Sequence, residues 1–265
     1  VGMNPFRPIY DACNTGDPAE KWASLPPFPR MIDLELTSAC NFRCLMCPTG
    51  NLSLARPAMF MDAETFEAIL RQCAEHGTAL RFIGWGEPLM HPAAISFIGW
   101  ANDVGLLTHL NTNGSHVTEA VAARLIERGL SSIKFSFQGA DRQSYAEMRN
   151  IDWFDGIIAT VGLFHAERGG GASPWIAVST TITDEVPETV EKFRETLTPI
   201  ADEVSVGHTI FDFMDLGAVR LRSRDKVRLA ELKSKQSVEK RHPVPCPEVY
   251  DKLSIHADGS VVVCC

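Results

Sequence analysis

Residues 32–47 read IDLELTSACNFRCLMC, a strand pattern that runs directly into a cysteine-rich loop. The first five residues alternate apolar and acidic side chains, which predicts a β-strand. Three cysteines then follow within eight residues, at Cys40, Cys44 and Cys47. Thiolates from one short loop suit three corners of a cubane iron–sulfur cluster, whose usual ligation takes four cysteines. The spacing therefore predicts a cluster with one iron open to an outside ligand.

The rest of the cysteine pattern leaves two alternatives open. A distant fourth cysteine would close the cluster, or the loop would belong to a zinc site. A standard zinc site pairs two Cys-x2-Cys units or adds histidines at fixed distances, and this loop has neither arrangement. Clustered cysteines in a chain that opens without an export signal favour a metal over disulfides. Cys13 and Cys73 fit no motif, and Cys73 is expected in the core.

A strand followed by a helix recurs along the chain after this loop. Strands are predicted at 32–36, 80–83, 106–110, 132–137, 175–181 and 204–210, and helices at 62–76, 92–104, 118–128, 152–168 and 187–197. Such alternation indicates parallel βαβ units, and six units predict an α/β fold, a partial (β/α)6 TIM-like barrel. Ligands of these folds bind at the carboxyl ends of the strands. The cysteine loop and residues 84–87, 111–114 and 138–139 should therefore meet at one mouth.

The two ends of the chain depart from this repeat. Residues 1–30 are rich in proline and predict an irregular lead-in that lies over the domain. The barrel, expected at 31–216, is followed by a charged stretch at 217–241 that predicts a solvated connecting helix. In the last segment, 242–265, Asp258-Gly259 lies between two apolar runs and predicts a small C-terminal β-hairpin.

Composition and charge narrow the classes of function. The chain has 265 residues, with 25 basic and 33 acidic side chains and a net charge of −8. That balance argues against unspecific nucleic-acid binding. The longest uncharged stretch, 89–102, is shorter than the roughly 18 apolar residues that a membrane span needs. No secretory signature opens the chain. We therefore expect a cytoplasmic globular protein with neither nucleic acid nor a membrane as partner.

From about Ile32 to Cys265, the sequence resembles the radical S-adenosylmethionine superfamily. That family carries Cys-x3-Cys-x2-Cys after the first strand of a partial (β/α)6 barrel, as Cys40, Cys44 and Cys47 do here. The resemblance implies that the open iron of a [4Fe–4S] cluster binds the amino and carboxylate groups of S-adenosylmethionine. It further implies reductive cleavage of the sulfonium, with an electron from a flavodoxin- or ferredoxin-type reductant. The resulting 5′-deoxyadenosyl radical would take a hydrogen atom from substrate.

Other positions match the S-adenosylmethionine contacts of that family residue by residue. Gly84-Trp85-Gly86-Glu87-Pro88 resembles its Gly-Gly-Glu-Pro motif, with Trp85 where a glycine is often seen. The resemblance implies that Gly86 and Glu87 receive the methionine ammonium. It implies that Ser136 contacts the ribose or the carboxylate, and that Arg149 pairs with that carboxylate through its guanidinium fork.

Two further positions near the cofactor are assigned less directly. Met46 stands where the family more usually has an aromatic residue near adenine, and a methionine fills such a gap. Asn113 either hydrogen-bonds the cofactor or only forms an Asn-Gly turn with Gly114.

The C-terminal segment resembles the start of the SPASM auxiliary-cluster domain, or its shorter twitch relative. That pattern begins with a cysteine, a gap and Gly-x4-Cys, as Cys246, Gly259 and Cys264 do here. The resemblance implies that Cys246 and Cys264 ligate an auxiliary [4Fe–4S] cluster. The later cysteines of the pattern are missing, so we expect the native chain to continue beyond Cys265. The alternative is a hairpin with two buried thiols.

The same resemblance narrows the possible classes of substrate. Members of that family with auxiliary clusters modify peptides, oxidise sulfatase residues, or oxidise and epimerise sugars and aminocyclitols. The short lead-in leaves no room for a separate leader-peptide-binding domain. We therefore expect an oxidoreductase or epimerase of a small polar substrate, of the sugar or aminocyclitol type. The alternative is a maturase that modifies a peptide or protein.

Candidate residues for substrate binding or proton removal follow the fourth and sixth strands. Gln138 replaces an aspartate common after the fourth strand, and His208 and Asp212 follow the sixth. A lone histidine near a strand end also fits a structural role. Two alternatives come from other classes of protein: an iron–sulfur electron-transfer module without radical chemistry, and a zinc-binding regulatory domain.

Overall fold

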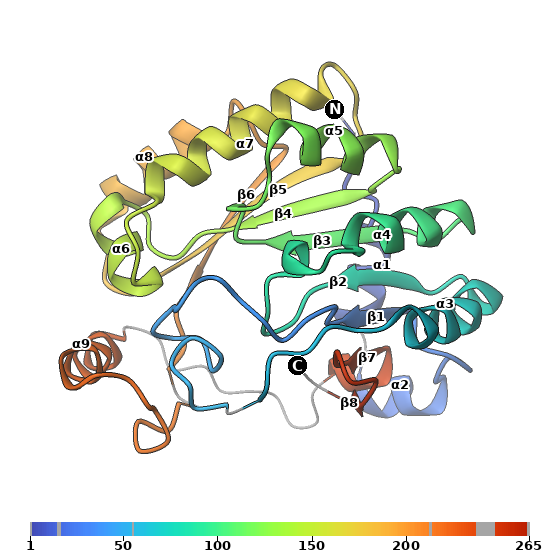
Figure 1. Cartoon of the computed structure of the whole chain (residues 1–265), viewed down its shortest axis with the longest axis horizontal. Helices are drawn as coiled ribbons and strands as arrows, with labels where there is room; N and C mark the ends of the chain where they lie inside the picture. Colours follow the sequence, from blue (N-terminus) through green and yellow to red (C-terminus); the bar gives the residue numbers. More distant parts are fainter. Residues whose placement is uncertain (1, 15–16, 55, 212–213, 237–246, 264–265) are drawn as a thin grey trace.

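The computed structural model describes residues 2–14, 17–54, 56–211, 214–236 and 247–263 (Figure 1). The strands are β1 (Met31–Leu34), β2 (Ala79–Phe82), β3 (Thr108–Thr112), β4 (Ser132–Ser136), β5 (Trp175–Ile182), β6 (Glu203–His208), β7 (Lys252–Ile255) and β8 (Val261–Val262). The helices are α1 (Arg7–Asn14), α2 (Pro18–Ala23), α3 (Ala63–His76), α4 (Ala94–Asp103), α5 (Glu119–Glu127), α6 (Arg142–Arg149), α7 (Phe154–Arg168), α8 (Pro187–Leu197) and α9 (Ser223–Ser234). Two 3-10 turns are η1 (Pro88–Met90) and η2 (Pro247–Tyr250). None of these described helices is long and apolar enough to cross a membrane.

A parallel sheet forms the body of the molecule. Neighbouring strands pair in the order β6-β5-β4-β3-β2-β1, and each of these pairs is parallel. The predicted α/β architecture with a partial barrel is confirmed, and the sheet is not closed. Helices α3, α4, α5 and α7 pack on the outer face of the sheet (Figure 1). At the centre of that packing, Phe66 of α3 stacks on Phe97 of α4 with ring centroids 4.1 Å apart.

Local signals set the ends of the helices largely as predicted. Asp62 caps α3, because its carboxylate accepts a 2.7 Å hydrogen bond from the Thr65 N–H. Gly77 ends this helix in the left-handed region, at φ of 64°, where glycine is favoured. The third strand begins two residues later than its predicted range of 106–110. Leu106 is buried like a strand residue, but it packs into the core from the loop before β3.

The prediction of an irregular lead-in is wrong for two stretches and holds for residues 24–30, which form neither helix nor strand. The lead-in contains α1 and α2, and prolines open both helices. Pro8 is the second residue of α1, and Pro18 is the first residue of α2, next to the N-cap residue Asp17. A proline in the first helical turn loses only an N–H that has no partner within the helix. Pro8 and Pro18 therefore mark helix starts, whereas Pro26, Pro27 and Pro29 lie in the irregular stretch that leads into β1.

The lead-in covers the amino ends of the strands. Phe6 is fully buried against Met31 and Ala79, the first residues of β1 and β2. Its ring also meets the edge of the buried His109 ring, with centroids 5.6 Å apart. The lead-in therefore packs against the amino ends of β1 to β3, opposite the carboxyl ends where the predicted site residues lie.

Helix α6 is a second feature that the sequence did not predict. Asp141 accepts a 2.8 Å hydrogen bond from the Ser144 N–H, and the Ser144 hydroxyl is 3.2 Å from the Asp141 N–H, which makes a capping box. The helix has only eight residues and only Tyr145 and Met148 form its buried apolar face, a pattern too short to predict a helix. Its importance is that its last residue is Arg149.

The C-terminal hairpin extends the sheet beyond β1. Strand β7 runs parallel to β1, with Met31 opposite Lys252 and Leu34 opposite Ile255, and β8 pairs antiparallel with β7. The predicted hairpin is therefore confirmed, and Gly259 supplies a φ of 80° in its turn.

Helix α9 lies within the stretch 217–241 but is not fully solvated. Its residues Leu229 and Leu232 share a buried cluster with Leu45 of the cysteine loop and Met148 of α6. Figure 1 shows α6 and α9 on the side of the sheet where the strands end. One face of α9 therefore shields the base of the cysteine loop from water.

Candidate active site

A cavity of ≈ 180 Å³ opens at the carboxyl ends of β1 to β4. Most of the residues that the sequence singled out line it: Cys40, Cys44, Met46, Cys47, Gly86, Glu87, Asn113, Ser136, Gln138 and Arg149. They come from four separate strand ends and from α6. The parallel sheet brings them together because all its strands end at the same edge.

The cysteine loop is held in shape by backbone hydrogen bonds. The Leu45 N–H donates to the Met148 carbonyl of α6 at 2.9 Å. The Asn51 side-chain amide donates to the Leu45 carbonyl at 2.9 Å, and its own N–H donates to the Cys47 carbonyl at 2.8 Å. The loop therefore folds back on itself and is anchored to α6.

Gly50 allows this tight fold. A Cβ atom added there would lie 2.3 Å from the Cys44 carbonyl oxygen and 2.6 Å from the Cys44 nitrogen. Backbone atoms cannot yield as a flexible side chain can, so no other residue fits without moving the loop. Sequence reasoning missed Gly50, although a glycine three residues after the last loop cysteine was a usable signal.

The three loop thiols form no disulfide, and burial favours the neutral form of two of them. Burial raises the pKa of Cys40 to about 11 and also raises the pKa of Cys47. A bound metal displaces the proton of such a thiol. Among the described residues, no three His, Cys, Asp or Glu side chains are arranged around a single metal ion. A four-iron cluster gives each thiolate its own iron and does not need the three thiols around one ion.

The turn after β2 lies against the chain that follows β1. A Cβ atom on Gly86 would lie 2.0 Å from the Thr37 carbonyl oxygen, and the Glu87 N–H donates to the Ala39 carbonyl at 2.8 Å. Gly86 is required for this close approach. The turn that resembles the ammonium-binding motif is thus fixed directly beside the cysteine loop.

Glu87 is buried and heavily hydrogen-bonded. It accepts from the Thr112 hydroxyl at 2.7 Å, the Asn113 N–H at 2.8 Å and the Leu89 N–H at 3.3 Å. Burial raises the pKa of Glu87, against the lowering effect of these hydrogen bonds. A carboxylate offers about four acceptor positions, so about one remains for a cation in the cavity.

Asn113 uses its side chain within the protein. Its Oδ1 accepts from the Ser115 N–H at 2.9 Å, and its Nδ2 donates to the Asn41 Oδ1 at 3.0 Å. This is the arrangement expected of the turn alternative. Asn41, which sequence reasoning passed over, thereby ties the third strand end to the cysteine loop.

Arg149 lies against the cysteine loop at the end of α6. Its Nη1 is 3.5 Å from the Cys44 sulfur, and its Nη2 donates to the Ser136 carbonyl. The guanidinium also lies over the Phe42 and Tyr145 rings, 6.0 and 5.8 Å from their centroids. Burial lowers the pKa of Arg149, but the neighbouring Cys44 and Tyr145 groups outweigh it and raise the pKa overall. The site therefore holds a permanent positive charge beside the thiols.

Two buried polar atoms next to the thiols have no hydrogen-bond partner among the described residues. They are the Arg149 Nε and the Tyr145 hydroxyl. Buried polar groups in native proteins are nearly always paired, and Arg149 lines the cavity, so its unpaired Nε fits a polar ligand there. A donor set of three thiols with adjacent unpaired donors fits an anionic cluster and a ligand with a carboxylate.

The remaining predicted residues lie at the wall of the cavity, away from it, or outside the described residues. Gln138 lines the cavity, and its Oε1 accepts from the Thr181 hydroxyl at 2.5 Å. His208 ends the edge strand β6, is exposed and does not line the cavity. The predicted residues Asp212, Cys246 and Cys264 lie outside the described residues.

Known proteins are similar to this chain in sequence and in fold. The family model of the radical SAM superfamily matches residues 34–198, more than half of the chain. An AdoMet-dependent heme synthase from Methanosarcina barkeri is 28% identical over 46% of this chain and 35% of its own length. A PqqA peptide cyclase from Gluconobacter oxydans is 33% identical over 45% of this chain and 34% of its own length. The chain thus matches only about a third of the length of these relatives.

Solved structures show the same fold. SuiB from Streptococcus suis, bound to S-adenosylmethionine, superposes on all of this chain and 66% of its own, with a TM-score of 0.69 and 16% identity. SuiB bound to its precursor peptide SuiA gives a TM-score of 0.68 with 17% identity, over all of this chain and 65% of its own. The family match and the three-cysteine mouth agree, and the chain belongs to the radical SAM superfamily.

Proposed function

We propose that this chain is the catalytic part of a radical S-adenosylmethionine enzyme that modifies a peptide. The observation that carries the proposal is the mouth of the barrel, where the three loop cysteines, Glu87 and Arg149 line one cavity. The peptide substrate is supported by the PqqA peptide cyclase, which is 33% identical over the matched segment.

The residues of the mouth divide the work of binding. Cys40, Cys44 and Cys47 would hold a [4Fe–4S] cluster, and Glu87 with the turn around Gly86 would receive the methionine ammonium of S-adenosylmethionine. When bound, cluster and cofactor supply a reducing electron and the source of a 5′-deoxyadenosyl radical. The charge of Arg149 would stabilise the anionic thiolates and orient the methionine carboxylate.

The peptide substrate replaces the small polar substrate that the sequence analysis put first. That preference rested on the short lead-in. The matched segment spans only about a third of each curated relative, so the lead-in says nothing about the whole protein. For a peptide substrate, Gln138 at the cavity wall is the candidate contact.

Further parts of the proposal rest on the resemblance alone. Residues 242–265 would begin an auxiliary-cluster domain, with Cys246 and Cys264 as ligands. The electron would come from a flavodoxin- or ferredoxin-type protein, and the enzyme would work in the cytoplasm. Iron counts above about four per chain after reconstitution would support the auxiliary cluster.

The first test is anaerobic. The protein is reconstituted with iron and sulfide, reduced with dithionite, and given S-adenosylmethionine, and 5′-deoxyadenosine is measured. We expect product from the wild type and none from Cys40→Ala, Cys44→Ala or Cys47→Ala, each checked for folding by circular dichroism. A reduced, iron-loaded wild type that yields no deoxyadenosine would favour the electron-transfer alternative.

The substrate class is tested with deuterium. Pools of perdeuterated peptides and of perdeuterated sugars are supplied separately, and the mass of the 5′-deoxyadenosine is measured. Deuterium transfer from the peptide pool supports the proposal, and transfer from sugars alone contradicts it.

A further inference from the structure

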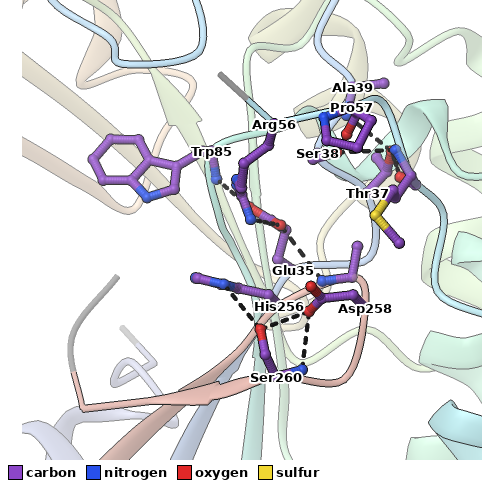
Figure 2. A network of polar contacts seen from close by, with 12 residues as sticks. Glu35, Thr37, Ser38, Ala39, Arg56, Pro57, Trp85, His256, Asp258 and Ser260 are labelled. Atoms are coloured by element: carbon purple, nitrogen blue, oxygen red, sulfur yellow. Dashed lines mark hydrogen bonds and ion pairs between the residues drawn. The ribbon is translucent and has the colours of Figure 1, made fainter. Parts of the chain in front are cut away.

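Glu35 is a buried carboxylate at the mouth that the roles above leave unused. It lies one residue beyond the end of β1, and only 2% of its surface is exposed. Arg56, from the segment after the cysteine loop, donates to both of its oxygens, at 2.8 and 2.7 Å (Figure 2). This is a bidentate pair, the strongest geometry for an arginine and a carboxylate.

The same carboxylate also accepts from two backbone N–H groups of other segments. Oε2 accepts from Trp85 at 2.9 Å, within the turn that carries Glu87. Oε1 accepts from Ala257 at 3.4 Å, in the turn of the C-terminal hairpin. The Glu35 N–H adds a 2.9 Å bond to the Ile255 carbonyl at the end of β7. Figure 2 shows Glu35 between Arg56 and Trp85 on one side and the hairpin turn on the other.

Gly84 lies directly against the Glu35 side chain. A Cβ atom on Gly84 would lie 2.6 Å from both the Cβ and the Cγ of Glu35. Gly84 therefore leaves the space that the Glu35 side chain occupies. In the same turn, Gly86 lies against the backbone of Thr37 and Ala39. Both glycines of the Gly-Trp-Gly-Glu turn thus serve its docking on the chain that follows β1.

The segment that carries Arg56 is fixed to the same stretch of chain. The Thr37 hydroxyl donates to the Met59 carbonyl at 2.6 Å, and the Ser38 hydroxyl donates to the Pro57 carbonyl at 2.8 Å. The guanidinium is therefore delivered to Glu35 by an ordered strap rather than by a free loop. A simple buried ion pair needs only one cation, whereas this carboxylate collects donors from three separate segments.

We propose that Glu35 is a positioning residue that locks the C-terminal hairpin to the S-adenosylmethionine-binding turn. Glu35 is not among the residues that line the cavity. It fixes the Trp85 backbone, and thereby the adjacent Gly86 and Glu87, in register with the hairpin turn at Ala257. The expected effect on cofactor binding rests on the proposed function, whereas the link between Glu35 and the hairpin rests on the structure alone.

The test uses hydrogen exchange and cofactor binding on the reconstituted full chain. In Glu35→Gln, one oxygen becomes an amide donor that faces N–H groups. We expect amide exchange to accelerate about tenfold or more in peptides that cover residues 84–87 and 255–259. We expect the dissociation constant of S-adenosylmethionine to rise about tenfold.

A second variant keeps the test valid if Glu35→Gln folds poorly. In Glu35→Leu/Arg56→Met both charged partners become apolar, a replacement that is often neutral for stability. The proposal expects this double variant to fold but to show the same fast exchange and weak binding. Recovery of both readouts would mean that Glu35 is only the counter-ion of Arg56, and would overturn the proposal.

The matched control is Asp202→Asn. Asp202 also pairs with a buried arginine, Arg168, and its carboxylate also accepts a backbone N–H, from Ile176 at 2.7 Å. Asp202 immediately precedes β6 and contacts the amino end of β5, away from the mouth, so both readouts should keep their wild-type values there.

The outcomes separate this inference from the proposed function. Unchanged exchange at 255–259 in Glu35→Gln overturns the lock, and changed exchange with unchanged cofactor affinity overturns the positioning role. A wild type that binds no S-adenosylmethionine when loaded with iron defeats the proposed function instead. The exchange experiment on the hairpin still decides the lock in that case.

Discussion

Gly50 allows the tight fold of the cysteine loop because it has no Cβ atom. We predict that Gly50→Ala reduces the iron and sulfide bound per chain after reconstitution, because the added Cβ would lie 2.3 Å from the Cys44 carbonyl oxygen. The measurement is iron and sulfide counting, with folding checked by circular dichroism.

Gly162→Ala is the matched control for this change. Gly162 lies inside α7, where an added Cβ meets nothing closer than 4.0 Å. The Gly162→Ala variant should retain the full iron content and gain about 0.5–1 kcal/mol of stability, because alanine has a higher helix propensity than glycine. Full iron in the Gly50 variant would contradict the assigned role of the loop.

The charge of Arg149 is the second property that belongs to the residue scale. We predict that Arg149→Met raises the dissociation constant of S-adenosylmethionine about 10- to 100-fold, since hydrogen bonds to charged groups contribute about 1.5–3 kcal/mol. Isothermal titration of the reconstituted protein measures it. Arg142→Met at the start of α6 is the control, because its ion pairs with Asp152 and Asp155 are exposed. Equal affinities in the two variants would refute the prediction.

At the scale of elements, the cap of α3 gives stability a pH dependence. The hydrogen bond from the Thr65 N–H holds the pKa of Asp62 below its ordinary value. A carboxyl whose pKa is lowered by folding stabilises the protein above its unfolded pKa, and the contribution disappears as pH falls through the folded pKa. In Asp62→Asn the cap remains but does not titrate.

We therefore predict that the stability difference between wild type and Asp62→Asn shrinks as pH falls from about 6 to about 2. Urea unfolding at several pH values measures it. Thr118→Ala at the cap of α5 is the comparison, because its hydroxyl does not titrate. It should cost about 1 kcal/mol at every pH. A difference for Asp62→Asn that is constant with pH would exclude the titrating cap.

At the scale of the whole molecule, one carboxylate joins both ends of the chain. Asp251 is buried and pairs with Lys21 of the lead-in at 2.7 Å and with Arg30 before β1 at 2.9 Å. We predict that Asp251→Asn lowers the free energy of unfolding by about 3 kcal/mol, because it removes the carboxylate that pairs with the nearly buried Lys21. Asp11→Asn, from the exposed pair with Arg7 in α1, should change it by less than about 1 kcal/mol. Similar losses in urea melts of both variants would contradict the prediction.

The site could be predicted from the sequence wherever its chemistry is local. The cysteine loop has its own spacing, and the Gly-Trp-Gly-Glu turn follows a strand pattern, so parallel topology alone brings them to one edge. The role of Glu35 was hidden, because the same alternation that reveals a strand makes its acidic residues look like an outer face. Helix α6 was also hidden, because its apolar face consists of only Tyr145 and Met148, too few residues to show a helical period.

From the amino-acid sequence come the six alternating strands, the helix caps and the cluster of thiols, since each depends on residues a few positions apart. The tertiary structure alone places β7 beside β1 and buries Phe6 against the first residues of β1 and β2. It brings Leu229 and Leu232 of α9 into one buried cluster with Leu45. It also brings Arg56, Trp85 and Ala257 to one carboxylate. These contacts join residues tens to hundreds of positions apart, and no periodicity in a sequence states which distant segment buries which face.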